Sequence, residues 1–129
     1  DPDEILTEIK VPFLSENTFG AYLRFCPGER PTAGVAALVT FAARGCIEDV
    51  VLTLGCVNPR PIRAVEAESI LRGQTLNEAL TCLEQAGEAG ARVCNPVDDL
   101  RGSIEYKRHI VKVLIKRVFR LACRRSGLL

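Results

Sequence analysis

Val-Val-Leu-Thr-Leu-Gly-Cys-Val-Asn-Pro-Arg-Pro, residues 50–61, marks the point where the pattern of this chain changes. Residues 50–57 are apolar and rich in β-branched side chains, which predicts a strand. Gly55 within this strand indicates either a bulge or the close approach of another backbone. Pro59 and Pro61 then stop the sheet, because proline has no N–H to donate to a ladder. Strand-like patterns precede this point and helix-like patterns follow it.

Three further strands are predicted before this point. Residues 5–11 and 19–25 alternate between apolar and more polar side chains, as half-exposed strands do. Residues 35–42 are almost continuously apolar, which is typical of a buried central strand. Arg44 and Gly45 indicate a hairpin turn between this strand and the next.

Helices are predicted after residue 61. Residues 64–71 suit a short helix that ends at Gly73. Thr75, followed three residues later by Glu78, predicts a capping box at the start of a second helix, which runs to about Ala91.

The end of this second helix is weakened by Gly87 and Gly90, at a cost of roughly 1 kcal/mol each. Ser103 is a suitable N-cap for a last helix that runs to about Arg125. Because strands fill the first half of the chain and helices the second, the sequence predicts an α+β fold. We expect one domain over residues 1–129, with a small antiparallel sheet of three to four strands followed by three helices packed on one face.

The composition excludes several classes of protein. The 129 residues are 47% hydrophobic and 26% charged with a net charge of +1, so the chain is neither disordered nor a polycation. A single histidine, His109, excludes a multi-histidine metal site. No stretch is long and apolar enough for a transmembrane helix, and the acidic N-terminus is not a secretory signal. Six cysteines occur without a CxxC pair, and we expect them to be reduced thiols.

The charges of the last predicted helix are unevenly distributed. Between Arg101 and Arg125 there are nine lysines and arginines, and Glu105 is the only acidic residue. Five of them follow each other at intervals of four residues and form a basic ridge: Arg108, Lys112, Lys116, Arg120 and Arg124. Because no aromatic residue lies among them, a solvated face or a protein contact is favoured over nucleic-acid binding. Asp98 and Asp99, just before this helix, are expected to stabilise its N-terminus.

Several short motifs match those of a known family. They are Glu4-Ile5-Leu6-Thr7-Glu8-Ile9, Val11-Pro12, Arg30-Pro31, Gly34-Val35-Ala36, Leu54-Gly55, Val57, Pro61, Arg63-Ala64, Glu68, Leu71, Gly73, Asp99, Arg101-Gly102-Ser103, Glu105-Tyr106 and Arg108-His109. The motifs of the last helix are the most specific. On these residues the chain resembles the C-terminal domain of the FAD-binding medium subunit of molybdenum hydroxylases, the carbon monoxide dehydrogenase and xanthine dehydrogenase family.

This resemblance implies a function that the residues alone do not show. It implies an accessory domain that packs against FAD and supports electron transfer from iron–sulfur clusters to the flavin. The implied partners are the upstream FAD-binding domains, a molybdopterin large subunit and an iron–sulfur small subunit, in the cytoplasm and without nucleic acid or membrane. We expect a piece of a longer subunit that is not catalytic and binds no FAD on its own. The parent enzyme's substrate is not readable from this domain.

The resemblance also implies three cofactor-binding residues. Arg24 stands where the family presents a lysine to the flavin, and Tyr22 falls where some members have an aromatic residue. Leu6 stands where the family's first strand places an apolar neighbour of the flavin. The chain departs from the family at Pro31, where an aspartate is common. A second hypothesis stays open, in which the domain is a non-catalytic interaction module that uses its basic C-terminal helix.

Overall fold

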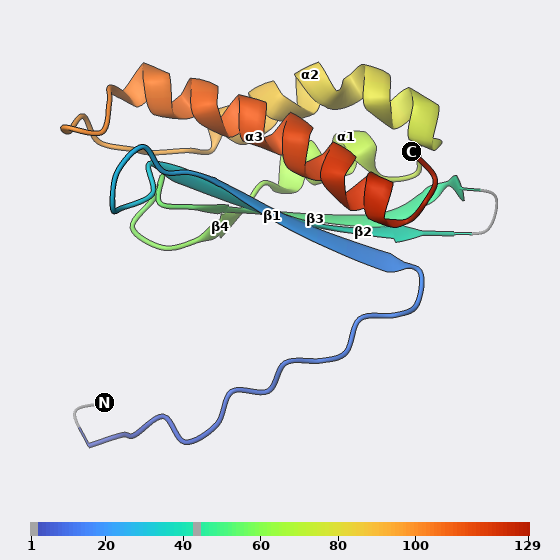
Figure 1. Cartoon of the computed structure of the whole chain (residues 1–129), viewed down its shortest axis with the longest axis horizontal. Helices are drawn as coiled ribbons and strands as arrows, with labels where there is room; N and C mark the ends of the chain where they lie inside the picture. The colour runs from blue at the N-terminus through green and yellow to red at the C-terminus, as the bar shows by residue number, and fades with distance from the viewer. Residues whose placement is uncertain (1–2, 43–44) are drawn as a thin grey trace.

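A four-stranded antiparallel meander forms the base of the molecule in the computed structural model, which describes residues 3–42 and 45–129 (Figure 1). Neighbouring strands in the sheet are also neighbours in the sequence, so the connections are short. The strands are β1 (Thr18–Phe25), β2 (Ala33–Phe41), β3 (Ile47–Gly55) and β4 (Ile62–Arg63).

Three helices follow the sheet and cover one of its faces. They are α1 (Val65–Leu71), α2 (Leu76–Arg92) and α3 (Ile104–Arg125). The longest helix, α3, packs on β1 and β2, and α1 packs on β3, while α2 lies against α1 and α3 (Figure 1). The predicted α+β class, with three helices on one face of a small antiparallel sheet, is confirmed.

The core lies between the sheet and the helices. Val35, Ala37 and Val39 alternate along β2 and are at most 1% exposed, because every second side chain of a strand points to the same face. Ile115 and Phe119 of α3 meet them from above and are fully buried. Burial of each large apolar side chain contributes roughly 1.5–3 kcal/mol, so this layer provides most of the stability.

The predicted caps of the two long helices are present. The Thr75 side chain accepts a hydrogen bond from the Glu78 backbone N–H, and the Glu78 carboxylate accepts one from the Thr75 N–H at 2.9 Å. The Ser103 hydroxyl accepts a hydrogen bond from the Tyr106 N–H at 3.1 Å. Gly73, after α1, has a φ of +79°, which glycine adopts without the strain of a side chain.

The prediction of a strand over residues 5–11 is wrong. Residues 4–15 form neither helix nor strand, and the segment runs away from the sheet (Figure 1). Its apolar side chains are exposed, 86% for Ile5 and 81% for Val11. The alternating pattern is that of a strand, but a strand also needs a neighbouring backbone. Within residues 3–42 and 45–129, no strand pairs with residues 5–11.

Other boundaries differ by a few residues. The predicted strand over residues 50–57 begins at Ile47 and ends at Gly55, because Cys56 adopts a φ of +67° and leaves the sheet. The bulge predicted at Gly55 is absent there, and the register shifts between Thr40 and Phe41 instead. Arg44 of the predicted hairpin turn lies outside the described residues.

Candidate functional site: the open face of the sheet

In the part of the chain that the structure describes, no helix or strand covers the face of the sheet opposite the helices, and we call this face the open face (Figure 1). Two of the three predicted cofactor-binding residues, Tyr22 and Arg24, lie on β1 at positions that alternate with the core-facing Ala21 and Leu23. Their side chains therefore point to the open face. Both side chains are exposed.

Two glycines of the neighbouring strands lie next to Tyr22 and Arg24 on this face. Arg24 pairs with Gly34 of β2, which in turn pairs with Gly55 of β3. The Tyr22 ring leans over Gly34, since a Cβ atom there would lie only 2.7 Å from the Tyr22 hydroxyl. A larger residue at position 34 would displace the ring. Gly55 lies opposite Gly34, but no backbone approaches it unusually closely, since a Cβ atom at Gly55 would lie 3.9 Å from the Gly34 carbonyl oxygen.

The charge of Arg24 is available to a ligand. Within the described part of the chain, no carboxylate lies within 4.0 Å of its guanidinium, whereas Arg63 and Arg72 are both engaged in ion pairs. Arg24 and Tyr22 thus offer a cation and an aromatic ring, and the ring lies over Gly34. A guanidinium and an aromatic ring side by side can contact one edge of a planar, partly anionic group.

The third predicted site residue, Leu6, does not join this set. It is 77% exposed and lies in the N-terminal segment that runs away from the sheet. The structure therefore brings Tyr22 and Arg24 together and leaves Leu6 apart. The sequence pattern around Leu6 predicts a strand but does not identify the part of the protein against which that strand packs.

The basic ridge is largely used inside the domain. Lys112 Nζ lies 2.6 Å from the Glu84 carboxylate and also pairs with Glu88, and Lys116 Nζ lies 2.7 Å from Glu84. Hydrogen bonds from both lysines lower the pKa of Glu84 to about 2. These contacts join α3 to α2. Glu84 and Glu88 lie four residues apart on one face of α2, but this spacing alone does not show that α3 lies alongside.

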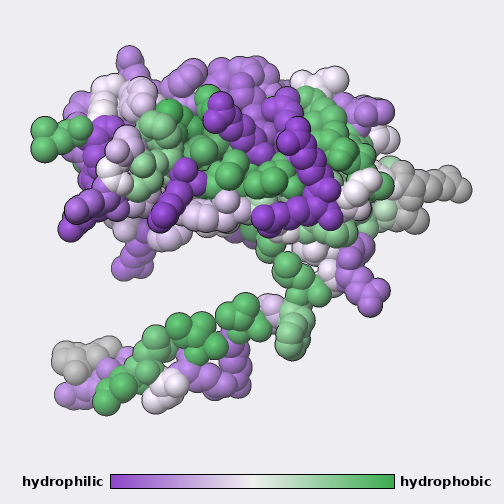
Figure 2. All heavy atoms as spheres, viewed as in Figure 1, coloured by the Kyte–Doolittle hydropathy of each residue, from purple (hydrophilic) through white to green (hydrophobic). Residues whose placement is uncertain are grey.

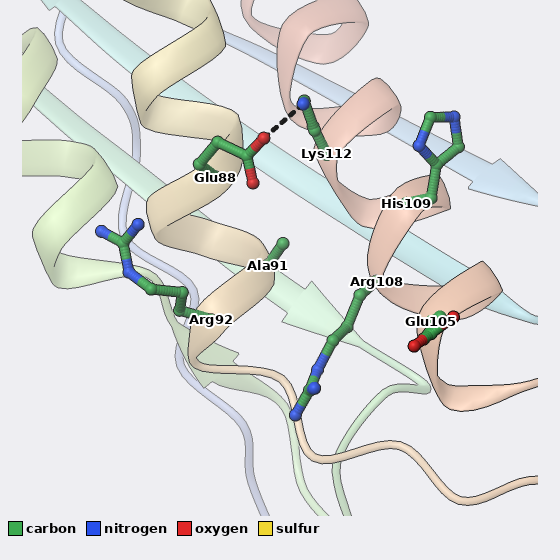
Figure 3. Close-up of a pocket in the computed structure, with 7 residues that line it drawn as sticks. All are labelled: Glu88, Ala91, Arg92, Glu105, Arg108, His109 and Lys112. Atoms are coloured by element: carbon green, nitrogen blue, oxygen red, sulfur yellow. Dashed lines mark hydrogen bonds and ion pairs between the residues drawn. The ribbon is translucent and has the colours of Figure 1, made fainter.

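A groove of about 410 Å³ lies where α2 and α3 meet, and Figure 3 shows the residues that line it. Lys112 is turned toward Glu88, and Arg108 reaches past the end of α2 to donate to the Cys94 carbonyl at 3.1 Å. The lining residues are Glu88, Ala91, Arg92, Glu105, Arg108, His109 and Lys112. These residues include no hydroxyl or thiol side chain that His109 could activate as a nucleophile.

Asp98 has the structural role expected of it at the start of α3, whereas Asp99 forms ion pairs. Asp98 accepts a hydrogen bond from the Ile104 N–H at 2.6 Å, at the first turn of α3. Asp99 pairs with Arg101 at 2.8 Å and with Lys107 at 2.7 Å, and Lys107 is only 4% exposed. Hydrogen bonds from Arg101 and Lys107 lower the pKa of Asp99 well below its usual range. In the described ranges, no group of three or more metal-ligating side chains is found.

All six cysteines are free thiols, as expected. Cys94 and Cys123 are at most 2% exposed, and burial raises the pKa of each to about 11. A thiol with such a pKa is almost entirely protonated near neutral pH and is unreactive. These two cysteines act as small apolar core residues.

Comparisons with known proteins agree with this fold. A model of the CO dehydrogenase flavoprotein C-terminal domain family matches residues 24–122. The chain is 34% identical to the glyceraldehyde dehydrogenase medium chain of Sulfolobus acidocaldarius over 119 residues, 91% of this chain and 41% of that protein. It is 28% identical to the carbon monoxide dehydrogenase medium chain of Hydrogenophaga pseudoflava over 129 residues, 98% of this chain and 44% of that protein.

Solved structures show the same likeness. Carbon monoxide dehydrogenase from Hydrogenophaga pseudoflava, in a form that lacks the Mo-pyranopterin moiety, matches with a TM-score of 0.80 and 30% identity, covering 89% of this chain and 40% of that one. The chain thus spans about two-fifths of the length of the proteins it matches. None of the helices in the described ranges has the length and hydropathy that a membrane span requires.

Proposed function

Because the chain belongs to the CO dehydrogenase flavoprotein C-terminal domain family, we propose that it is the accessory domain of the FAD-binding subunit of a molybdenum-containing hydroxylase or dehydrogenase. The observation that carries this proposal is the open face, where the exposed side chains of Arg24 and Tyr22 stand together and the Tyr22 ring lies over Gly34. The helices already cover the other face, so the open face is the side of the sheet left for the flavin and the domains that hold it.

Each residue of this set has a distinct task in the proposal. FAD, when bound, accepts electrons from the iron–sulfur clusters and passes them on. The Arg24 guanidinium stabilises negative charge on the reduced ring or on the phosphates, and arginine does so with a wider, planar donor set than the family's lysine. The Tyr22 ring packs against the cofactor, and Gly34 keeps that ring in place. Leu6 contributes an apolar contact once its segment is held by the preceding domains.

The N-terminal segment supports a role for those domains. Five side chains of this segment are more than 70% exposed: Ile5, Leu6, Ile9, Val11 and Phe13. Such a run of apolar side chains rarely stays in water. We infer that the segment pairs as a strand with the upstream FAD-binding domains, which explains why residues 5–11 have the pattern of a strand without a partner here.

The names of the relatives support a proposal for the remaining partners. Proteins similar to this chain are named medium chains or medium subunits. We propose that this domain works in a complex with a molybdopterin large subunit and an iron–sulfur small subunit, in the cytoplasm. The substrate is chosen in the large subunit, so this domain does not determine it.

A hybrid subunit tests the proposal. In the medium chain of Hydrogenophaga pseudoflava carbon monoxide dehydrogenase, this chain would replace the matching C-terminal part. We expect the purified hybrid to retain FAD, the same protein truncated before the domain to lose it faster, and the isolated 129-residue chain to carry none. Stoichiometric FAD on the isolated chain, or equal retention by the truncated protein, would contradict the proposal.

A further inference from the structure

One edge of the sheet is open. The carbonyl of Asn17, directly before β1, accepts a hydrogen bond from the Phe41 N–H of β2 at 3.0 Å, and in the same register the odd-numbered residues of β1 face β2. The N–H and C=O groups of Gly20, Tyr22 and Arg24 therefore point outward. Only the Gly20 carbonyl is used there, since it accepts a hydrogen bond from Arg125 at 2.5 Å. Within the described residues, Tyr22 and Arg24 have no partner on this side.

A row of arginines of α3 stands directly above this edge. Arg117, Arg120 and Arg124 lie on one side of the helix together with Leu121, because their spacing of three and four residues places them on one face. With Leu23 of β1 they line a hollow of about 260 Å³, which we call the arginine groove. On the face shown in Figure 2, hydrophilic side chains of α3 border apolar ones where the helix meets β1.

These arginines differ from the lysines earlier in the same helix. Lys112 and Lys116 are paired with glutamates of α2. No carboxylate in residues 3–42 and 45–129 lies within 4.0 Å of Arg117, Arg120 or Arg124. Within the described residues, these three arginines without a carboxylate partner thus lie beside the unpaired backbone groups of the β1 edge.

We propose that the β1 edge and the arginine groove together bind an extended acidic segment of a partner polypeptide, which adds a strand to the sheet. An added strand pairs its backbone with Tyr22 and Arg24, as in other cases of strand addition. Its side chains alternate, so every second one faces α3 as Leu23 does. Acidic residues at those alternate positions meet the guanidinium groups of Arg117, Arg120 and Arg124.

The opposite explanation is that the arginines only protect the edge from aggregation, as charged side chains often do. Protection requires charge but no particular partner. Strand addition requires a peptide that offers both carboxylates and free backbone N–H groups, whereas protection of the edge requires no peptide. A nucleic acid offers charge without a strand, and the groove has no aromatic residue on which a base would stack. Strand addition depends on the β1 edge and the arginine groove and does not require a bound flavin.

Fluorescence anisotropy with short labelled peptides tests this directly on the full 129-residue chain at physiological salt. The probe alternates glutamate and threonine. One control peptide replaces each glutamate by lysine, and another keeps the glutamates but carries N-methyl groups on the backbone nitrogens that would pair with β1. We expect saturable binding of the first peptide alone, with slower amide exchange at Tyr22 and Arg24. Equal binding of the N-methylated peptide would overturn strand addition.

A variant separates the groove from overall charge. We expect Arg117→Ala, Arg120→Ala and Arg124→Ala together to weaken peptide binding at least about tenfold, because each ion pair at a surface adds a modest amount. The matched control, Lys10→Ala with Arg30→Ala and Arg60→Ala, removes the same charge elsewhere and should leave affinity within about twofold. Unchanged binding by the groove variant would contradict the proposal. So would tighter binding of single-stranded DNA than of the peptide, or self-association through this edge.

Discussion

The carboxylate of Glu68 accepts a hydrogen bond from the backbone N–H of Leu52 at 2.9 Å, across sixteen positions of sequence. Within residues 3–42 and 45–129, β4 pairs only with Thr53 and Leu54, and the outer edge of β3 has no strand beside it at Leu52. Glu68 is 1% exposed and takes the place of the missing strand, and Arg63 holds its other oxygen at 2.6 Å. One edge of the sheet is thus closed by a buried carboxylate, while the β1 edge stays open.

Removing this carboxylate should destabilise the domain. Glu68→Ala leaves the Leu52 N–H buried without an acceptor, which costs about 1–3 kcal/mol of unfolding free energy. Glu68→Gln retains an acceptor and should cost less. Glu29→Ala, in an exposed loop, is the control and should be nearly neutral. Urea denaturation measures all three, and an equal effect of the Glu68→Ala and Glu29→Ala substitutions would refute this role.

Gly90 is needed for the contact between α2 and α3. A Cβ atom at this position would lie 2.1 Å from Cδ1 of the fully buried Ile115. Alanine improves helix propensity by about 1 kcal/mol, but overpacking costs about 1–3 kcal/mol, so Gly90→Ala should be neutral to destabilising by up to about 2 kcal/mol.

A double variant checks the cause of that loss. Ile115→Val removes the Cδ1 atom, so adding it to Gly90→Ala should recover part of the lost stability. The two substitutions should therefore be non-additive in urea denaturation. Simple additivity would show that the clash is not the reason for glycine at this position.

The helices were predictable because their signals are local. Thr75 and Glu78 satisfy each other's backbone groups three residues apart, whatever the rest of the chain does. The absence of a strand over residues 5–11 was not predictable. An alternating pattern shows which side chains of a strand would share a face, but not whether a neighbouring strand exists to pair with it. The roles of Gly90 and Lys112 were hidden for a similar reason. Each depends on which helix lies alongside, and the spacing within one helix does not give that.

The candidate site was predictable in part for the same reason. The alternation of β1 places Tyr22 and Arg24 on one side of the strand, and the structure puts both on the open face. The position of Gly34 under the Tyr22 ring depends on the register between β1 and β2, which the sequence pattern leaves open.

Acid should weaken the contact between Asp99 and Lys107. The pKa of Asp99 is lowered in the folded state, so its charge stabilises the fold above its ordinary pKa near 4 and loses this effect as the pH falls below that value. Asp99→Asn should therefore be less stable than the natural chain at pH 7, with a difference that shrinks toward pH 3. Unfolding free energies across this range measure it, and a constant difference would contradict the assignment.

Alkaline solution should weaken the core through its thiols. Cys94 and Cys123 have folded pKa values of about 11, above the ordinary value of 9.0, so the folded state retains protons that the unfolded state releases. Their contribution to stability is full below pH 9 and is lost between pH 9 and 11. The variant with Cys94→Ala and Cys123→Ala should show a smaller loss of unfolding free energy over this range. An identical loss would assign the effect to other groups.

The most direct test of the proposed flavin contact is the flavin of the hybrid subunit after replacement of Arg24. We expect Arg24→Ala to lower the flavin reduction potential and to weaken FAD retention about tenfold, because a charge-assisted contact to the cofactor is lost. Arg24→Lys should recover much of both, and Arg117→Ala, on the helical face, should leave both unchanged. An Arg24→Ala hybrid with the potential and FAD retention of the unsubstituted hybrid would contradict the account.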